Sequence, residues 1–457
     1  MSEHGLAAAV AKMQAAGANG PAIDVFAHYY RQASAGVTGL IGEDTIAPLT
    51  DPPQLSAATV DERTAHEAIA RTVIIKLNGG LGTSMGLDQA KTLLPVREGL
   101  TFLDLIVRQI MAAREAYDAP LPLLFMNSFR TRADTLAHLE RYPDLPVAGL
   151  PVDFLQNAEP KITVDTLEPI DWPADPTLEW CPPGHGDVYT ALVGSGVLDA
   201  LLAAGMKYAS ISNGDNLGAA PDARLAGWFA GTGAPYAAEI CPRTINDRKG
   251  GHLAIRKSDG QLILRDTAQT PAEDMDYFTD EHRHPYFHTN NLWIDLEQLK
   301  AALLQRGAVL GLPLIYNEKN VDPSDSSSPK VIQLETAMGA AIEVFAGATA
   351  IAVPRSRFQP VKTTNELLLL RSDVFDLGSD GRLSQTVDDL PRVDLDGRFY
   401  RLIDEFQSRV RVAPSLKEAR SFVVEGDWTF DRPVVATGEA AFPDLGRPAV
   451  AGVDGPR

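Results

Sequence analysis

The sequence feature that most constrains this chain is the segment 73–96, VIIKLNGGLGTSMGLDQAKTLLPV. A short β-branched run ends in a loop with four glycines, and Lys91 follows the loop. Glycine permits positive φ angles and leaves no Cβ between its N–H group and a ligand. Successive bare N–H groups after a strand form an anion-binding concavity, and a lysine adds a full positive charge beside it. The segment therefore predicts a strand that leads into a phosphate-binding loop.

Two better-known phosphate loops do not fit this segment. A P-loop requires G-x-x-x-x-G-K-[ST], and no glycine in the segment precedes a Lys-Ser or Lys-Thr pair. The dinucleotide fingerprint requires G-x-G-x-x-G, whereas Gly80, Gly82 and Gly86 are spaced G-x-G-x-x-x-G. Asp104 does lie about 20 residues on, where a ribose-binding acid is expected. The spacing disfavours a nicotinamide-dependent dehydrogenase, and a plain tight turn remains the simpler alternative to a phosphate site.

The composition is that of an ordinary globular protein of 457 residues, of which 45% are hydrophobic and 22% charged. This length suits two or three domains. A net charge of −19 argues against nucleic acid or an anionic membrane as a partner. It does not argue against a phosphate site, because exposed charges beyond about 8 Å are largely screened. A lysine about 4 Å from a phosphate contributes about 4 kcal/mol at an effective dielectric of about 20.

Cysteine content and the N-terminal sequence favour a cytoplasmic location. Cys181 and Cys241 are too few for a disulfide framework and lack metal-ligand spacing, so we expect two buried thiols in a reducing compartment. The first 20 residues are Ala-rich with helical spacing and lack the basic and apolar regions of a secretory signal. No apolar run approaches the roughly 18 residues that span a bilayer.

A strand–helix alternation begins at residue 73 and predicts an α/β fold with a mixed, mostly parallel sheet. The predicted strands span 73–77, 121–128, 207–213 and 234–240, and the predicted helices span 102–116, 131–142 and 223–231. Polar residues stand at the carboxyl ends of three of these strands: Asn78, Asn127 with Ser128, and Asn213 with Asp215. Ligands bind at the carboxyl ends of strands in open α/β sheets, so we expect a cleft there.

The remaining segments predict smaller elements. Residues 252–266 predict a hairpin that turns at Ser258–Gly260. The polar, turn-rich segment 317–330 predicts a mobile loop over or beside the cleft. Residues 396–410 predict one amphipathic helix, and the short apolar runs that follow it predict a small β appendage.

Several long motifs then point to one family. CPPGHGDVY (181–189), SNGDNLG (212–218), FHTNNLW (287–293) and PVKTT (360–364) follow LNGGLGTSMG in that order, together with IQLETAMGAAIEVF (332–345) and VPRSRF (353–358). From about residue 40 to about residue 435, the chain closely resembles the eukaryotic-type UTP–glucose-1-phosphate uridylyltransferases. The residue pattern predicts an N-terminal helical segment (1–60). The resemblance implies a Rossmann-like nucleotidyltransferase domain (61–385) and a C-terminal helix with a truncated left-handed β-helix (386–457).

The resemblance also implies the reaction. UTP and α-D-glucose 1-phosphate would give UDP-glucose and pyrophosphate, with Mg²⁺ as the metal. A sugar-phosphate oxygen attacks the α-phosphorus of UTP in line, so the enzyme's main task is to position two polyanions and neutralise their charge. Lysines, backbone amides and a metal suit this task, and the reaction needs no nucleophilic side chain.

Individual residues take their expected roles from the matching motifs. Lys91 and Lys362 match the catalytic lysines, and Asp215 matches the metal-binding aspartate, since Mg²⁺ usually takes one or two carboxylates plus phosphate oxygens and water. Gln156 matches the glutamine that reads uracil, whose edge an amide complements. The expected nucleotide-binding residues are Leu77, Asn78, Gly79, Gly80, Lys91, Gln156, Gly184 and Asp215. The expected sugar-phosphate-binding residues are Gly79, Gly80, His185, Asn213, Gly214, Asp215, Asn290, Asn291 and Glu335.

Three alternatives remain beside this interpretation. Within the same reaction class, the substrate could be an N-acetylhexosamine 1-phosphate or galactose 1-phosphate. A catalytically silent UDP-sugar sensor is disfavoured because both lysines and Asp215 are present together. A dehydrogenase is disfavoured by the glycine spacing. We expect UTP and glucose 1-phosphate as partners, and the sequence leaves a homo-oligomer open as the assembly.

Overall fold

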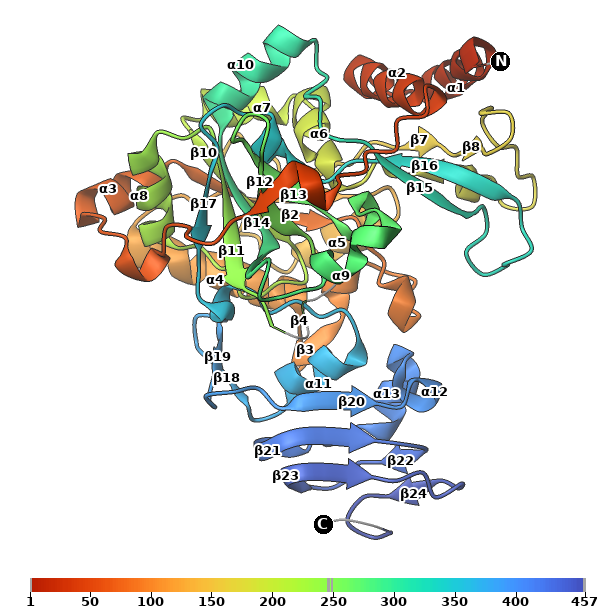
Figure 1. The fold of residues 1–457 in the computed structure, drawn as a ribbon. Coiled ribbons are helices and arrows are strands. Elements are labelled where there is room, and N and C mark those ends of the chain that lie inside the picture. Colours follow the sequence, from red (N-terminus) through yellow and green to blue (C-terminus); the bar gives the residue numbers. More distant parts are fainter. Residues whose placement is uncertain (1, 245–246, 248–249, 455–457) are drawn as a thin grey trace.

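A mixed, largely parallel sheet forms the centre of the computed structural model, which describes residues 2–244, 247 and 250–454. The strand order is β1-β12-β14-β10-β2-β5-β6, with β11 between β14 and β17 and with β13 beside β12 (Figure 1). β6, β5, β2 and β10 run parallel, and β14 runs antiparallel to both β10 and β11. The strands span Ile46–Pro48 (β1), Thr72–Asn78 (β2), Leu123–Asn127 (β5), Asp153–Leu155 (β6), Tyr208–Asn213 (β10), Tyr236–Pro242 (β11), His252–Arg256 (β12), Leu262–Arg265 (β13), Tyr286–Asp295 (β14) and Thr349–Ala352 (β17).

Helices cover both faces of the sheet, which explains why β2 has apolar residues on both of its faces. Ile74 packs into a core with α3, α4 and α8 on one face, whereas Val73 and Ile75 pack into a core with α6, α7 and α10 on the other. The predicted strands and helices of this region are confirmed. The helices span Glu62–Ala70 (α3), Phe102–Tyr117 (α4), Arg132–Leu139 (α5), Val188–Gly194 (α6), Val197–Ala203 (α7), Ala223–Thr232 (α8) and Leu296–Arg306 (α10).

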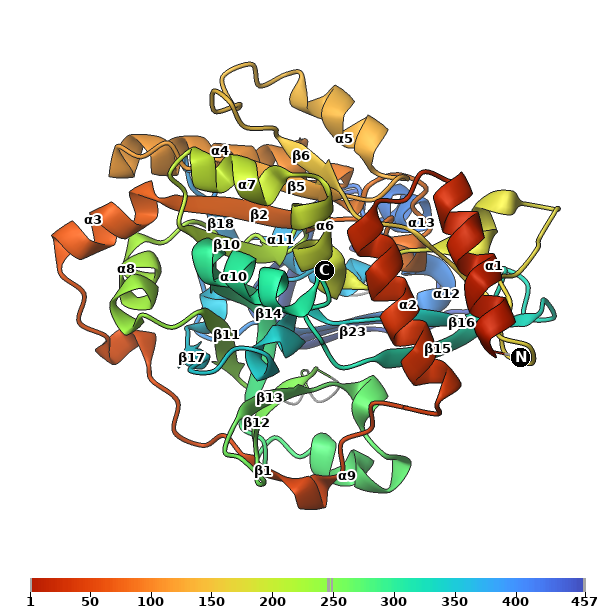
Figure 2. The same cartoon turned by 90° about the horizontal axis from the view of Figure 1, so that it is seen from above.

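The N-terminal helices α1 (Ser2–Ala15) and α2 (Gly20–Ser34) lie side by side, far from α3 and α8 (Figures 1 and 2). They pack on a smaller sheet of β8 (Ile162–Thr163), β15 (Ile315–Asn320) and β16 (Lys330–Glu335). Tyr30 and Ile332 are fully buried in this contact. Residues 1–60 are not helical throughout, because β1 pairs antiparallel with β12 of the central sheet.

Two local predictions are wrong. Residues 317–330 do not form one loop, because β15 and β16 make an antiparallel hairpin, and Val321 of its connection is buried against Ile170 and Val331. Residues 396–410 form two short helices, α12 (Gly397–Tyr400) and α13 (Ile403–Arg409). The break falls at Leu402, which has an extended backbone and whose side chain packs over Gly86 of the glycine loop.

The C-terminal region consists of short parallel strands stacked below the central sheet (Figure 1). Trp428, Phe430 and Phe442 form its buried aromatic core. The predicted β appendage is confirmed, and the hairpin predicted at 252–266 is confirmed as β12 and β13. The strands span Arg392–Leu395 (β20), Ser415–Val424 (β21), Trp428–Thr429 (β22), Val435–Phe442 (β23) and Ala449–Val450 (β24), and α11 (Thr364–Arg371) precedes them.

No single helix in the described ranges is both long and apolar enough to cross a membrane. The segment 185–194, which includes α6, and α7 together pass that test by length and composition alone, as a pair bent by 69°. Val188, Leu192 and Leu201 of this pair are buried in the core on the α10 face of the sheet.

Candidate active site

A cavity of about 500 Å³ opens at the carboxyl ends of β2 and β10, where the strand-end residues predicted a cleft. It brings together eleven of the expected site residues, from segments far apart in the chain. These are Leu77, Asn78, Gly79, Gly80, Lys91, Gln156, Gly184, His185, Asn213, Gly214 and Asp215. Thr92, Met126 and Pro182 also line the cavity, and sequence analysis did not single them out.

Two glycines of this cavity lie too close to their neighbours to leave room for a side chain. A Cβ at Gly79 would lie 2.7 Å from the Gln156 Oε1 atom, and a Cβ at Gly184, whose φ is +75°, would lie 2.5 Å from the Thr336 carbonyl oxygen. At Gly184 the obstacle is backbone and the φ angle is left-handed, so another residue would push the loops apart, whereas a Cβ at Gly79 would displace the end of the Gln156 side chain. The Gln156 amide donates a hydrogen bond to the Gly184 carbonyl at 2.8 Å. The glycines therefore let Gln156 close one end of the cavity.

Asn78 holds the strand ends together. Its amide nitrogen donates to Asn127 Oδ1 at 2.8 Å and to Thr135 Oγ1 at 2.9 Å, and its amide oxygen accepts from Thr92 Oγ1 at 2.6 Å. The side chain is buried. It fixes the residues that follow the glycine loop onto β2 and β5, which leaves the backbone of Asn78 to line the cavity.

Lys91 and Asp215 form the central ion pair of the cavity. Lys91 Nζ lies 2.5 Å from Asp215 Oδ2 and also donates to the Val361 carbonyl. Asn216, the residue after Asp215, pairs with Pro360 through a β-bridge. The segment that carries Lys362 therefore contacts Lys91 through the Val361 carbonyl, and it contacts the residue next to Asp215 through Pro360.

Lys362 itself lines a different cavity, of about 450 Å³, which also includes Arg355, Asn365 and Arg392. Its backbone follows directly after Val361, the acceptor of the Lys91 amine. The structure therefore brings the chain at Lys362 to the site without placing the Lys362 amine in the same cavity as Lys91.

A buried ion pair anchors this segment, and sequence analysis missed it. Glu239 is 0% exposed and accepts from Arg357 Nε at 2.6 Å and Nη2 at 2.9 Å. Burial alone would raise the pKa of Glu239, but the Arg357 charge and three donors hold it below its ordinary value. A glutamate inside the apolar strand APYAAEI was the signal that could have revealed a buried partner.

The same network uses two asparagines, Asn216 just after β10 and Asn291 within β14. Asn216 Nδ2 donates to Asn291 Oδ1 at 3.0 Å, and Asn216 Oδ1 accepts from the Gln359 N–H group at 2.8 Å. Asn291 Nδ2 in turn donates to Glu239 Oε2 at 3.2 Å. The Asn291 amide thus lies in the buried network and not on the cavity wall.

The other residues expected on the sugar side have varied surroundings. His185 lines the cavity, its Nδ1 accepts from the Met338 N–H group at 3.0 Å, and burial lowers its pKa, so its ring is neutral. Asn290 has a left-handed backbone with a φ of +56°, and its side chain lies 3.1 Å from His288 Nδ1. Glu335 accepts from Asn317 at 2.9 Å outside the cavity lining.

A metal at this site would have one carboxylate from the chain. Among the described residues, no group of three or more His, Cys, Asp or Glu side chains is arranged to hold a metal. Asp215 is the one carboxylate among the described residues that line the cavity. This donor set fits a cation that takes most of its ligands from phosphate oxygens and water, as Mg²⁺ does.

Asp104, at the position of a ribose-binding acid, lies away from the cavity. It completes a capping box with Thr101 at the start of α4, and it accepts from Tyr142 Oη at 2.6 Å. Its hydrogen-bond capacity is used within the helix layer. The geometry agrees with the glycine spacing in disfavouring a dehydrogenase.

Comparison with known proteins decides the family. The family model described as UTP–glucose-1-phosphate uridylyltransferase matches residues 23–436. The chain belongs to this family. Among proteins with that name, the one from Solanum tuberosum is 38% identical over 404 residues, which cover 87% of this chain and 80% of the relative. The one from Saccharomyces cerevisiae is 40% identical over 373 residues, which cover 81% of this chain and 73% of the relative.

Solved structures of UDP-glucose pyrophosphorylases share this fold. A mutant from Leishmania major in complex with UDP-Glc aligns with a TM-score of 0.90 at 42% identity and covers 98% of both chains. A Trypanosoma brucei protein described as a UDP-glucose phosphorylase aligns with a TM-score of 0.90 at 41% identity, over 98% of this chain and 97% of that one. Members of the uridylyltransferase family therefore match both the central sheet and the C-terminal strands.

Proposed function

We propose that this chain transfers the uridylyl group of UTP to α-D-glucose 1-phosphate, giving UDP-glucose and pyrophosphate. Family membership supports the reaction, and one structural observation supports the position of the active site. Lys91 and Asp215 form an ion pair inside a cavity whose floor is a glycine loop. A cation, an acid that can hold a metal and bare backbone amides are the groups that in-line phosphoryl chemistry needs.

The chain's own residues would divide the binding of UTP between them. The backbone of Gly79 and Gly80 would contact the nucleotide, and Gln156 would read the uracil edge from the end of the cavity. Asp215 would hold Mg²⁺, which supplies charge neutralisation at the phosphates when bound. Lys91 would exchange its contact with Asp215 for the UTP phosphates. Leu77, Asn78 and Gly184 complete the proposed nucleotide side.

Glucose 1-phosphate would bind on the sugar side of the same cavity. His185, Asn213 and Gly214 line that side. Asn290, Asn291 and Glu335 would act from behind it, by ordering the groups that touch the sugar. The neutral ring of His185 suits a hydrogen bond to a sugar or phosphate oxygen without adding charge.

Lys362 would reach the reacting phosphates through a shift of the segment that carries it. The Val361 carbonyl holds the Lys91 amine, so release of Lys91 toward the phosphates would free this segment at the same moment. Lys362 would then bridge the two reactants in the transition state. The proposal thus couples the two lysines through one backbone group.

A substrate panel tests the function. We expect pyrophosphate release from UTP plus glucose 1-phosphate at a kcat/KM at least about tenfold above that with galactose 1-phosphate or an N-acetylhexosamine 1-phosphate. A silent sensor would bind UDP-glucose with no turnover on any sugar phosphate. A preference for another sugar 1-phosphate would move the assignment within the same reaction class.

Three broader features belong to the same proposal. The parallel C-terminal strands would form a short left-handed β-helix, and the chain would divide into regions 1–60, 61–385 and 386–457. The location would be the cytoplasm, a reducing compartment that suits the two buried free thiols, Cys181 and Cys241. Homo-oligomer formation stays a prediction that sedimentation equilibrium would test.

A further inference from the structure

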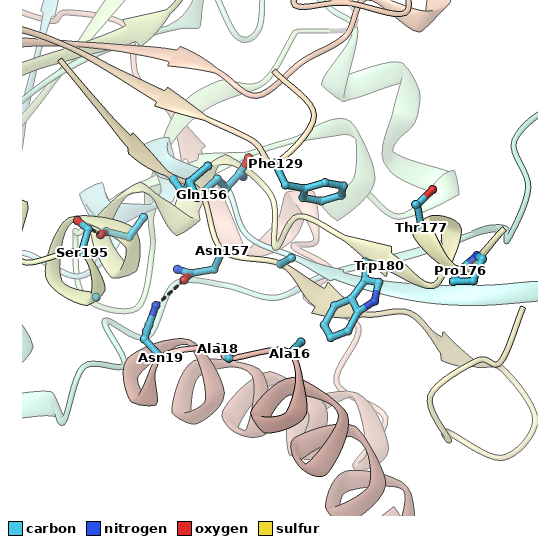
Figure 3. A pocket seen from close by; sticks show the side chains of 15 residues that line it. Ala16, Ala18, Asn19, Phe129, Gln156, Asn157, Pro176, Thr177, Trp180 and Ser195 are labelled. Carbon is cyan, nitrogen blue, oxygen red and sulfur yellow. Dashed lines mark hydrogen bonds between the residues drawn. The ribbon is translucent and has the colours of Figure 1, made fainter. Parts of the chain in front are cut away.

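A second cavity, of about 630 Å³, lies behind the candidate active site. The turn between α1 and α2 forms one wall, and the residues that follow β6 form the opposite wall (Figure 3). The end of α6 and the segment around Trp180 close its sides. Gln156 lines both this cavity and the candidate active site, so the two share a single side chain as their partition.

The lining of this cavity carries no charge among the residues that the structure describes there, although 22% of the chain's residues are charged. The rings of Phe129 and Trp180 border the same space (Figure 3). Phe129 is 46% exposed and Leu155 38% exposed, which is unusual for large apolar side chains in this protein. Arg130 reaches Thr177 Oγ1 at 3.3 Å from the exposed side but does not line the cavity. A charged ligand inside the lining would therefore lose its hydration without a charged partner there, whereas a neutral ring system would cover these side chains.

Amide groups supply a polar edge to the otherwise apolar wall. Asn19 Nδ2 donates to Asn157 Oδ1 at 2.8 Å across the cavity wall (Figure 3). Each of these two side chains keeps a further N–H or lone pair for a ligand, because an amide has two donors and an oxygen with two lone pairs. A lactam or similar edge, with one donor beside one acceptor, complements such a pair.

Hydrogen bonds connect this wall to the candidate active site. Asn157 donates from its backbone N–H to Asp187 Oδ2 at 2.7 Å and from its amide to Asp187 Oδ1 at 2.8 Å. Asp187 ends the short turn that begins at His185. Gln156 reaches the same loop through the Gly184 carbonyl. A ligand that moves residues 155–157 would therefore move the uracil end of the active site.

We propose that this cavity is a second small-molecule site, which takes a neutral bicyclic heteroaromatic compound with a lactam-type edge and alters UTP binding when filled. The effect on UTP rests on the proposed function, whereas binding to the cavity does not. By linkage, a ligand that changes UTP affinity has its own affinity changed by UTP to the same extent. A second chain copy or a peptide on this surface would be a different occupant.

Carbostyril, a neutral bicyclic lactam, is the probe, and its binding to the full chain is measured by saturation-transfer NMR and calorimetry. We expect binding with a dissociation constant below about 1 mM, the scale for a ligand of this size. Quinaldate, an anionic bicyclic compound, should bind at least about tenfold more weakly. Lack of carbostyril binding, or equal binding of quinaldate, would overturn the proposal. The proposal would also be overturned if only a second copy of the chain covered this surface.

Two variants locate the site, each with a matched control. Ala16→Phe should fill the cavity from its rim and weaken carbostyril binding at least about tenfold, whereas Ala11→Phe, at an exposed position elsewhere on α1, should leave it unchanged. Phe129→Ala should weaken binding severalfold by removing one ring, whereas Leu304→Ala, at a side chain 75% exposed on another face, should not. Unchanged binding in both cavity variants would contradict the location.

Coupling to the active site is measured separately. Saturating carbostyril should change the dissociation constant for UTP, measured by calorimetry, at least about fivefold, the low end of allosteric coupling, and saturating UTP should shift the carbostyril dissociation constant by the same factor. If UTP displaces carbostyril completely, the cavity is part of the nucleotide site and the proposal fails. If carbostyril binds but UTP is not turned over, the proposed function fails and the second site stands.

Discussion

Lys91 Nζ and Asp215 Oδ2 lie 2.5 Å apart, although 124 residues separate them in the chain. Each has a side chain that is largely buried at the edge of the same cavity. In this arrangement the cation and the acid neutralise each other. Substrate phosphates and a metal would take over both partners, so the pair keeps the ligand-free site from carrying an unpaired buried charge.

Removal of Asp215 tests its role as the metal ligand. We expect Asp215→Ala to raise the Mg²⁺ concentration for half-maximal activity at least about tenfold, because the cation loses its one carboxylate from the chain. Initial rates of pyrophosphate release across a Mg²⁺ titration give this value. Asp199→Ala is the control, since Asp199 also pairs with a lysine, at 2.7 Å, but on the exposed surface. An unchanged titration for Asp215→Ala would place the metal elsewhere.

A single amide-to-acid change tests base reading by Gln156. The Gln156 amide donates to the Gly184 carbonyl at 2.8 Å, and a carboxylate in its place would lose that donor and repel the carbonyl. We expect Gln156→Glu to lower the ratio of kcat/KM for UTP over CTP at least about tenfold. Competition assays with both nucleotides measure the ratio. If selectivity stays the same while overall activity falls, Gln156 only shapes the loop.

The buried Glu239–Arg357 pair should contribute far more to stability than the exposed Arg392–Asp394 pair. Arg357→Met leaves Glu239 buried without its cation and should cost about 3–5 kcal/mol of unfolding free energy. Arg392→Met removes a pair with Asp394 at 2.6 Å, in which the two side chains are 67% and 49% exposed, and should cost about 1 kcal/mol or less. Urea denaturation measures both values. Equal costs would mean that the buried pair does not anchor the 355–362 segment.

Lys76 should make stability depend on pH. Burial lowers the pKa of this amine to about 7, while an unfolded lysine keeps its proton up to about pH 10. Between these values the unfolded state binds more protons, so stability rises with pH and is lost again as pH falls toward 7. Relative to Lys76→Met, the wild-type unfolding free energy should rise by up to about 1.4 kcal/mol per pH unit from pH 7 to 10. Parallel pH profiles for the two proteins would contradict this titration, and Lys417→Met controls for an exposed lysine.

Local sequence was enough to predict the parts of the fold that depend on local chemistry. The apolar run before Asn78, the glycines after it and the period of α4 each lie within one stretch of chain. The contacts that build the site instead join residues from distant stretches of the chain. Glu239 and Arg357 are 118 residues apart, and Lys91 and Val361 are 270 apart. Partner choice at such distances is set by the three-dimensional packing and not by the residues nearby.

The two wrong segments show how tertiary contacts override local pattern. Polar and turn-forming residues dominate 317–330, yet β15 gains its partners from β16, which in turn pairs with β8. The 396–410 segment has helical periodicity, but Leu402 leaves the helix to pack over Gly86. Helical propensity costs only tenths of a kcal/mol per residue to override, less than burial of one leucine side chain contributes.

The most direct test of the site is the turnover of Lys362→Ala with UTP, glucose 1-phosphate and Mg²⁺. Lys362 lies in a separate cavity in this structure, so a large effect requires the two lysines to meet during the reaction. We predict that kcat falls by a factor of about 100 or more, the scale of one lost transition-state charge contact, while Lys417→Ala keeps normal turnover. A kcat for Lys362→Ala close to that of the wild type would contradict the convergence of Lys91, Asp215 and Lys362.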